Sequence, residues 1–236
     1  MQRRRIERRR RSTTSLLFDE RLASRYEAWY ETGEGQRADA LEKALLLKML
    51  QRFPGSKHLL EVGCGTGHFT RWFAHLGLRT IGLDLSPAML AEARKRNGIV
   101  LILGDAAYLP FADDSIELVA LITTLEFLPQ PQRALREAVR VARRGIILGV
   151  LNGLSILALQ RRAEGLFRRT VYSRAHLFHV WELKRLVQRA LDHRLVSIGW
   201  RTTLFPKFLR LRDSSLPFGG FIGMWVSLGG DEEGQS

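Results

Sequence analysis

A glycine-rich turn, G-C-G-T-G, is the feature that most constrains the fold of this chain. Gly63, Gly65 and Gly67 alternate directly after a short apolar run, near whose end lies Glu61. A turn of this kind lets a ligand come very close to the backbone, at the start of the helix that follows. The ligand is a pyrophosphate, a triphosphate or a group without phosphate, and the surrounding residues discriminate among these three.

Strand patterns and helix patterns alternate on both sides of the turn. Strands are expected at residues 58–62, 79–85, 99–103, 116–122 and 145–151, and helices at 68–76, 87–96 and 131–142. This rhythm predicts βαβ units with right-handed crossovers, and therefore a parallel sheet. Two helices are expected before the turn, at 18–32 and 37–52, with Gly33 and Gly35 ending the first of them. A helix at 181–190 and strands at 195–204 and 221–227 are expected near the end of the chain.

The expected organisation is a single domain, residues 18–228, between two polar tails, and a chain of 236 residues suits one such domain. The tails are a basic disordered segment at 1–17 and a polar segment at 229–236. The domain divides into N-terminal cap helices at 18–55, a cofactor-binding core at 58–151, a basic insertion at 152–179, and a last helix with C-terminal strands at 180–228.

The chain is strongly basic, with a formal net charge of +13. Such a balance favours an anionic partner such as RNA, a membrane surface or an acidic metabolite, and leaves all three open. The Arg-rich tail is interpreted as disordered; an organelle transit peptide, or a tail that contacts nucleic acid or anionic lipid, are the alternatives. No apolar run approaches the roughly 18 residues of a membrane span.

Cysteine and histidine usage narrows the chemistry. Cys64 is the single cysteine, which excludes a disulfide within the chain and a metal site of several thiolates, and favours a reducing, cytoplasmic setting. His176 and His179 lie three residues apart, but no further His, Cys or acid cluster completes a metal set. No metal is therefore expected.

The residues after the turn exclude two of its usual ligands. A P-loop requires Lys and Ser or Thr after its last glycine, whereas His68 and Phe69 follow Gly67. The dinucleotide fingerprint has its third glycine one residue later than Gly67, which disfavours NAD and FAD. The N–H groups at a helix N-terminus still favour a negative group, and a carboxylate meets that requirement.

Acids follow the next two strands. Asp84 ends the second strand, where a carboxylate can accept hydrogen bonds from a ribose diol. Asp105 follows the third strand and can accept from an exocyclic amine, while the N–H of Ala106 can donate to an adjacent ring nitrogen. The three strand ends together specify a carboxylate, a ribose and an adenine-like base.

Four stretches of the chain resemble a known family. They read L-L-E-V-G-C-G-T-G, T-I-G-L-D-L-S-P-A-M-L-A-E-A-R, G-D-A-A-Y-L-P-F-A-D-D-S-I-E-L-V and L-R-E-A-V-R-V-A-R-R-G-I-I-L-G-V, and cover about residues 58–151. In this order they resemble the class I S-adenosylmethionine (SAM)-dependent methyltransferases, in particular the small "type 11" group. The resemblance implies SAM as cofactor and an α/β, Rossmann-like, seven-stranded, mostly parallel sheet with helices on both faces and the last strand antiparallel.

The resemblance also implies roles for individual residues around the cofactor. Glu61 supports the turn, Cys64 is a small turn residue, and Gly63, Gly65 and Gly67 line the methionine part. Asp84 takes the ribose hydroxyls, Leu85 and Met89 flank the adenine, and Asp105 and Ala106 read its edge. Tyr26 and Trp29 would cover the cofactor from the N-terminal helix, with a place in the hydrophobic core as the alternative, and Thr123 follows the fourth strand beside the cofactor.

Methyl transfer from a sulfonium is an in-line displacement, in which the protein mainly aligns the acceptor and excludes water. The acceptor is expected beyond the fourth strand, where residues 122–129 lack the N-P-P-Y type of sequence that related enzymes use for nitrogen acceptors. Glu126 in this stretch is the candidate general base, with a role in shaping the pocket as the alternative.

The sequence therefore predicts a cytoplasmic SAM-dependent methyltransferase of a small-molecule or lipid-like acceptor. Three alternatives stay open: an RNA methyltransferase that uses the basic tail and insertion, a non-catalytic SAM-binding protein, and an NAD-dependent dehydrogenase, which the glycine spacing disfavours. The acceptor, the methylated atom and the oligomeric state are not determined by these patterns.

Overall fold

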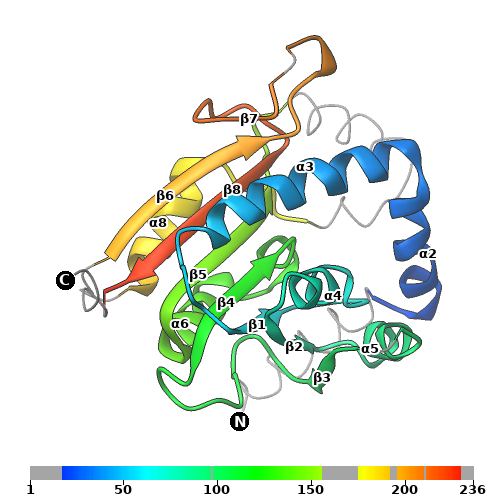
Figure 1. Cartoon of the computed structure of the whole chain (residues 1–236), viewed down its shortest axis with the longest axis vertical. Coiled ribbons are helices and arrows are strands. Elements are labelled where there is room, and N and C mark those ends of the chain that lie inside the picture. Colours follow the sequence, from blue (N-terminus) through cyan, green and yellow to red (C-terminus); the bar gives the residue numbers. More distant parts are fainter. Residues whose placement is uncertain (1–17, 97, 156–174, 192–195, 210, 230–236) are drawn as a thin grey trace.

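The structure is a computed structural model that describes residues 18–96, 98–155, 175–191, 196–209 and 211–229 (Figure 1). The expected basic tail and residues 156–174 of the expected insertion lie outside the described residues, as do residues 230–236 of the polar tail. Among the helices of the described ranges, none has the length and apolar character needed to cross a membrane.

The secondary structure follows the predicted alternation. The strands are β1 (His58–Val62), β2 (Arg79–Asp84), β3 (Val100–Leu103), β4 (Ile116–Ile122), β5 (Ala142–Leu151), β6 (Val196–Thr203), β7 (Asp213–Ser214) and β8 (Phe221–Leu228). The α-helices are α2 (Glu20–Glu31), α3 (Gly33–Leu50), α4 (His68–His75), α5 (Pro87–Arg94), α6 (Pro131–Val141) and α8 (Val180–Ala190). Two short 3-10 helices are η1 (Leu125–Phe127) and η3 (Lys207–Leu209).

The strands form one mixed sheet in the order β3-β2-β1-β4-β5-β8-β6-β7. Strands β1 to β5 are mutually parallel, and β8 lies antiparallel between β5 and β6. The predicted fold class is confirmed, including the antiparallel last strand. The sheet has eight strands instead of seven, because the two residues of β7 pair with Thr202 and Thr203 at the edge of β6.

The sheet has a hydrophobic core on each face, because successive side chains of a strand point to opposite sides. In β4, Leu118 and Ala120 pack under α3 and α4, whereas Val119 and Leu121 pack under α6 and α8. Helices α3 and α4 lie in front of the sheet in Figure 1, and α6 and α8 lie behind it. Both faces are thus covered, which explains the nearly continuous apolar sequence of the central strands.

The break between α2 and α3 differs from the prediction. Gly33 and Gly35 were expected to end the first helix, but they form the first turn of α3. The Thr32 hydroxyl accepts a hydrogen bond from the N–H of Gly35 (3.0 Å) and so caps the new helix. Gly35 is required for close packing, since a Cβ there would lie 2.0 Å from the carbonyl oxygen of Trp29.

Candidate functional site

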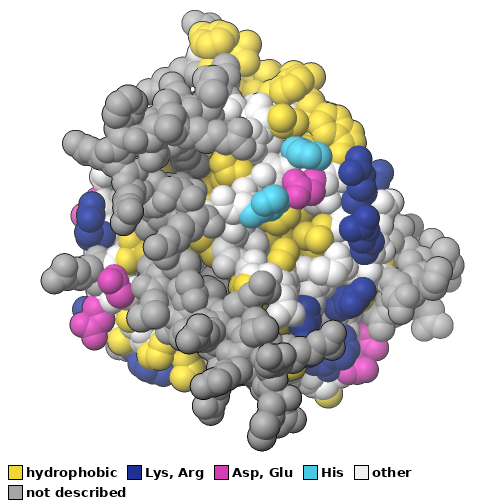
Figure 2. Space-filling model, turned by 180° about the vertical axis from the view of Figure 1, so that it is seen from behind, with side chains coloured by type: hydrophobic (Ala, Val, Ile, Leu, Met, Phe, Trp, Pro, Cys, Tyr) yellow, Lys and Arg dark blue, Asp and Glu magenta, His cyan; other side chains and the backbone are white. Residues whose placement is uncertain are grey.

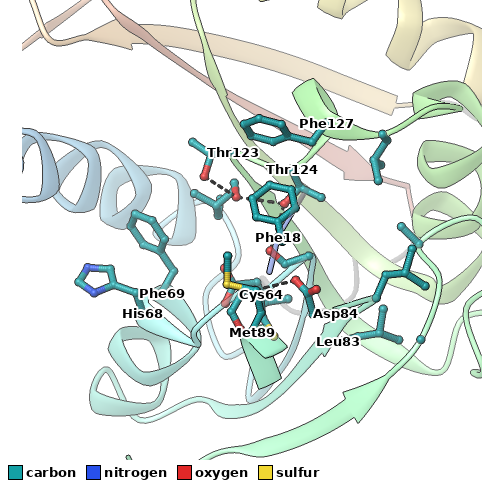
Figure 3. Close-up of a pocket in the computed structure, with 18 of the residues that line it drawn as sticks. Phe18, Cys64, His68, Phe69, Leu83, Asp84, Met89, Thr123, Thr124 and Phe127 are labelled. Atoms are coloured by element: carbon teal, nitrogen blue, oxygen red, sulfur yellow. Dashed lines mark hydrogen bonds between the residues drawn. The ribbon is translucent and has the colours of Figure 1, made fainter. Parts of the chain in front are cut away.

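An open cavity of about 980 Å³, mouth included, lies at the carboxyl ends of β1, β2 and β4 (Figure 3). Its wall contains most of the residues that the sequence singled out: Tyr26, Glu61, Gly63, Cys64, Gly65, Asp84, Leu85, Met89, Asp105, Ala106 and Thr123. Segments far apart in the chain thus meet at one edge of the sheet, as the strand order requires.

Asp84 is the central acid of the cavity. Its Oδ2 atom accepts from the N–H of Gly65 (2.8 Å), and its Oδ1 atom accepts from the N–H of Ser86 (2.8 Å). Burial raises the pKa of this carboxyl. Each carboxylate oxygen keeps further acceptor capacity, so Asp84 can hold two loops and still bind hydroxyl groups of a ligand.

The three glycines of the turn have different roles. All have φ in the left-handed region, at +74° for Gly63, +54° for Gly65 and +77° for Gly67. A Cβ on Gly63 would lie 2.3 Å from Cγ2 of Thr124, and one on Gly67 would lie 2.7 Å from Cδ1 of Ile99. A Cβ on Gly65 would meet no atom of the described residues within 4 Å, so Gly65 is the glycine of the turn that leaves open space in the cavity. Gly67 does not line the cavity, although the sequence predicted that it would line the methionine part of the cofactor.

Glu61 before the turn and Cys64 within it are both buried. Burial raises the pKa of Glu61 to about 8, the Asp84 charge acts in the same direction, and the Thr70 hydroxyl bonds to Glu61 Oε2. Glu61 is therefore largely protonated at neutral pH and carries no charge into the core. Burial also raises the pKa of the Cys64 thiol well above its usual range, which favours the thiol over the nucleophilic thiolate.

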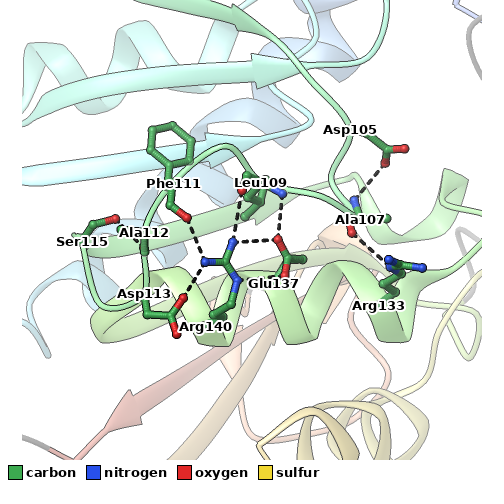
Figure 4. Close-up of polar contacts among 10 residues, drawn as sticks. All are labelled: Asp105, Ala107, Leu109, Phe111, Ala112, Asp113, Ser115, Arg133, Glu137 and Arg140. Carbon is green, nitrogen blue, oxygen red and sulfur yellow. Dashed lines mark hydrogen bonds and ion pairs between the residues drawn. The ribbon is translucent and has the colours of Figure 1, made fainter.

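The loop after β3 is held by one arginine from α6 (Figure 4). Arg140 donates to the carbonyls of Leu109 (3.1 Å) and Phe111 (2.8 Å) and forms a bidentate pair with Glu137 (2.9 and 2.8 Å). The hydrogen bond from Arg140 lowers the pKa of Glu137, which also accepts from the N–H of Leu109 (2.8 Å). This network positions the loop that carries Asp105 and Ala106.

Asp105 and Ala106 lie at the cavity end of that loop. The Oδ1 atom of Asp105 accepts from the N–H of Ala107 (2.9 Å), and Ala106 is buried. Arg133 donates to the carbonyl of Ala107 (3.2 Å) and lies 3.8 Å from the ring centroid of Tyr108. The carboxylate of Asp105 and the N–H of Ala106 thus belong to neighbouring residues of a turn that Arg133 supports.

A histidine that the sequence missed as a site residue forms part of the wall. His68 Nε2 lies 2.7 Å from Asp39 Oδ1, and the His68 ring stacks on Tyr30 at 3.7 Å between centroids. Burial acts to raise the pKa of Asp39, but the hydrogen bonds from His68 and from Lys43 (2.7 Å) outweigh it and lower that pKa. In Figure 3 His68 lies beside Phe69, at the α3 side of the cavity.

Aromatic and aliphatic side chains make up the rest of the wall. Phe18 and Phe127 meet edge to face, 5.2 Å between centroids, and both are drawn over the cavity in Figure 3. The further wall residues that sequence patterns did not identify are Tyr30, Phe69, Leu83, Gly104, Ile122, Leu128 and Pro129. Only tertiary contact distinguishes such residues from ordinary core side chains.

Thr123 and Thr124 directly follow β4 and lie in the cavity wall. Thr123 has a φ of +48°, which is unusual for a β-branched residue and marks backbone strain. Its N–H donates to the carbonyl of Gly149 (2.7 Å), so the adjacent strand holds the strained conformation. Strain of this kind is concentrated at ligand sites and has no signal in the local sequence.

Besides Gly67, two predicted site residues do not line the cavity. Glu126 is 2% exposed and its Oε1 atom accepts from the N–H of Leu151 (2.6 Å), so it joins η1 to the end of β5. This geometry does not support a general base at Glu126. Trp29 packs against the core under α3 and α4, because the face of α2 that meets the cavity carries Tyr26 and Tyr30 instead.

Comparison with known proteins finds methyltransferases among the proteins to which this chain is similar. Residues 60–149 match a family model described as a methyltransferase domain. The chain is 36% identical over 104 residues to a demethylmenaquinone methyltransferase of Renibacterium salmoninarum, covering 44% of each chain. It is 33% identical over 126 residues to a malonyl-[acyl-carrier protein] O-methyltransferase of Serratia marcescens, covering 53% of this chain and 48% of that one. The chain thus spans about half the length of these curated relatives.

A solved structure extends the similarity beyond the core. A SAM-dependent methyltransferase of Thermotoga maritima superposes with a TM-score of 0.69 at 26% identity, covering 91% of this chain and 99% of that one. The similarity therefore includes the helices before the glycine turn and the strands after the core.

Proposed function

We propose that this chain, whose core over residues 60–149 belongs to the class I SAM-dependent methyltransferases, methylates a small, lipid-like acceptor. SAM supplies an activated methyl group when it is bound. The protein then has to hold the cofactor, orient the acceptor and exclude water.

The residues of the cavity fit SAM. Asp84 offers acceptor oxygens to a ribose diol, and Asp105 with the N–H of Ala106 offers an acceptor and a donor to an adenine edge. The open space at Gly65 accepts a group against the backbone, beside the N-terminus of α4. Nothing in this donor set calls for a pyrophosphate.

The observation that carries the acceptor class is the apolar wall beyond β4. Ile122, Phe127, Leu128 and Pro129 lie there, with Phe18 in edge-to-face contact with Phe127. Such a wall desolvates an apolar acceptor at low cost, whereas a nucleotide or polar acceptor would leave its polar groups without partners. The match to a demethylmenaquinone methyltransferase agrees with this reading.

Where the acceptor must lose a proton, His68 is the wall residue that can take it. Asp39 engages its Nε2 atom and leaves Nδ1 as the second ring nitrogen. His68 is the first residue of α4 and directly follows the glycine turn. This assignment replaces the sequence-based candidate Glu126.

The test uses methyl-labelled SAM with the purified chain in a host cell extract, followed by separation of solvent-soluble, small polar, RNA and protein fractions. Label in the solvent-soluble fraction, absent with Asp84→Ala, supports the proposal. Label in nuclease-sensitive material would establish an RNA methyltransferase instead. Binding of S-adenosylhomocysteine without label in any fraction would point to a non-catalytic binding protein and contradict turnover.

A further inference from the structure

The connection between β6 and β8 exposes large apolar side chains. They form an apolar patch of Phe208 (77% exposed), Phe218 (57%), Leu216 (49%), Leu209 (45%) and Leu211 (38%). Figure 2 shows hydrophobic side chains gathered at the top of one face, above a row of Lys and Arg side chains. Clustered exposure on this scale marks an interaction surface, because solitary surface apolar residues are ordinary but contiguous ones are not.

The connection is firmly attached to the domain through its backbone. Arg37 of α3 donates to the carbonyl of Phe205 (2.9 Å). The buried Asn152 side chain donates to the carbonyls of Pro217 (2.7 Å) and Gly219 (2.7 Å). Two hydroxyl groups of β6 bond to further carbonyls of the connection, Thr202 to Leu216 and Thr203 to Arg212. The polar backbone thus faces the sheet, and the patch side chains are directed outward by it.

The sequence of the connection is basic. In the sequence, Lys207, Arg210 and Arg212 alternate with the apolar residues. The acid of this segment is Asp213, which pairs with Lys48 (2.5 Å) and Arg201 (3.1 Å), so its charge is compensated by the domain. A run in which apolar and basic residues alternate in the sequence has the composition of a surface that inserts at an anionic lipid interface.

The patch lies at the cavity edge of the sheet. β6 runs parallel to β4 and β5, so the connection leaves the sheet at the same edge as the cavity. Helix α3 joins the two sites, because Arg37 holds Phe205 and Asp39, two residues later, holds His68. A surface bound through the patch would lie close to the mouth of the cavity.

We propose that the apolar patch docks this protein on the surface of an anionic lipid bilayer. The inference rests on the proposed function, since docking would bring the cavity to a lipid-like acceptor. A second copy of the chain fits the patch less well, because each copy carries a net charge of +13. An acidic carrier protein would be recognised by the cations alone and would leave the five apolar side chains exposed.

Vesicle flotation of the full chain tests the proposal. The vesicles are phosphatidylcholine alone, or phosphatidylcholine mixed with phosphatidylglycerol. We expect binding to the anionic vesicles that weakens with salt, and a partition coefficient roughly tenfold lower or more for the double variant F208S/F218S. Both positions are exposed, so the variant should keep its fold, which S-adenosylhomocysteine binding confirms.

The matched control is V100S/L103S on β3, at the opposite edge of the sheet. Its two side chains are 59% and 58% exposed, similar to the patch, and we expect wild-type partition. Equal binding of F208S/F218S and wild type, or equal loss in both double variants, would overturn the proposal. So would a dimer that F208S/F218S dissociates, with no vesicle binding by either protein. Flotation requires no methyl acceptor, so its failure is distinct from failure of the proposed function.

Discussion

At the scale of single residues, the site is organised by backbone conformation and by titratable side chains. The glycine turn shows this best, because three glycines that look equivalent in sequence meet three different surroundings. Gly63 faces a threonine, Gly67 faces an isoleucine from the next βα unit, and Gly65 faces the open cavity. The same substitution should therefore have different consequences at each position.

Gly65→Ala is expected to weaken S-adenosylhomocysteine binding by roughly tenfold or more, because its methyl group would occupy the space left for the ligand. Gly67→Ala is the matched control, since its φ is also positive but its methyl group would meet Ile99. We expect Gly67→Ala to lower the unfolding midpoint while the dissociation constant, measured by calorimetry, changes little. Equal affinities for the two variants would contradict the role of Gly65.

Glu61 should make stability depend on pH. Its pKa in the folded chain, about 8, lies above its ordinary value of 4.5, so the folded state holds a proton that the unfolded chain releases. This contribution is complete below pH 4.5 and is lost as the pH rises through about 8. It amounts to a few kcal/mol in order of magnitude.

Glu61→Gln keeps a neutral side chain at every pH, and should flatten that decline. Urea unfolding midpoints measured between pH 4.5 and about pH 8 test this prediction. Glu20→Gln is the exposed control, for which we expect the wild-type dependence of the midpoint on pH. An unchanged slope in Glu61→Gln would show that Glu61 is ionised in the folded protein.

His68→Asn is expected to lower turnover by on the order of a hundredfold while cofactor binding is retained, because a proton acceptor is removed. The groups that face His68 are Asp39, whose neighbour is Lys43, on α3 and Tyr30 on α2, so Asp39→Asn should shift the pH profile of kcat/KM without abolishing it. His75→Asn, exposed at the end of the same helix, is the control. A pH profile of His68→Asn that keeps the wild-type shape would exclude proton transfer at His68.

At the scale of elements, loops that carry ligand groups are held by side chains of helices from elsewhere in the chain. Ser86 caps α5 by accepting from the N–H of Met89 (3.2 Å), and also donates to the carbonyl of Phe18 (2.8 Å). Arg140 performs the same task for the loop after β3. The contact between Ser86 and Met89 is local and can be predicted from the sequence. The contacts of Ser86 with Phe18 and of Arg140 with the loop after β3 join distant segments.

Arg140→Lys should loosen the loop after β3. Lysine cannot reproduce the bidentate pair and the two carbonyl bonds, so we expect a loss of about 1–3 kcal/mol in unfolding free energy and weaker cofactor binding. Arg136→Lys, exposed on the same helix, should leave both unchanged. Thermal unfolding with and without S-adenosylhomocysteine measures the two effects, and a wild-type response of Arg140→Lys would contradict the role of this network.

At the scale of the whole molecule, helices approach the sheet closely because small residues lie where layers meet. A Cβ on Gly145 of β5 would lie 2.2 Å from Cε1 of Phe53 and 2.8 Å from the carbonyl oxygen of Val226. The first contact comes from the end of the helical layer and the second from the neighbouring strand. Gly145 therefore sets the spacing of two layers at once.

Gly145→Ala is expected to destabilise the fold by about 1–3 kcal/mol, because a ring and a backbone atom must both move. Gly33→Ala is the control, since none of the residues that the structure describes lies within 4 Å of its Cβ position in the first turn of α3. Chemical denaturation should show Gly33→Ala to be neutral or slightly stabilising. Equal midpoints for the two variants would show that the layers adjust without cost.

Much of this protein follows from short-range patterns in its sequence. The bounds of β1 and β4, the cap at Ser86 and the positions of Asp84 and Asp105 after their strands all depend on residues within a few positions of one another. Parallel strands bring their carboxyl ends to one edge, so a correct strand order was enough to bring these acids to one cavity.

The tertiary structure alone decided which way the remaining side chains turn. His68 meets Asp39 across 29 positions of sequence, and Glu126 is drawn away from the cavity by a backbone N–H 25 positions later. The strain at Thr123 and the exposure of Phe208 are likewise set by the segments that pack beside them. The physical reason is that periodicity and turn chemistry act locally, whereas the partner of a buried polar group is chosen only when distant segments pack together.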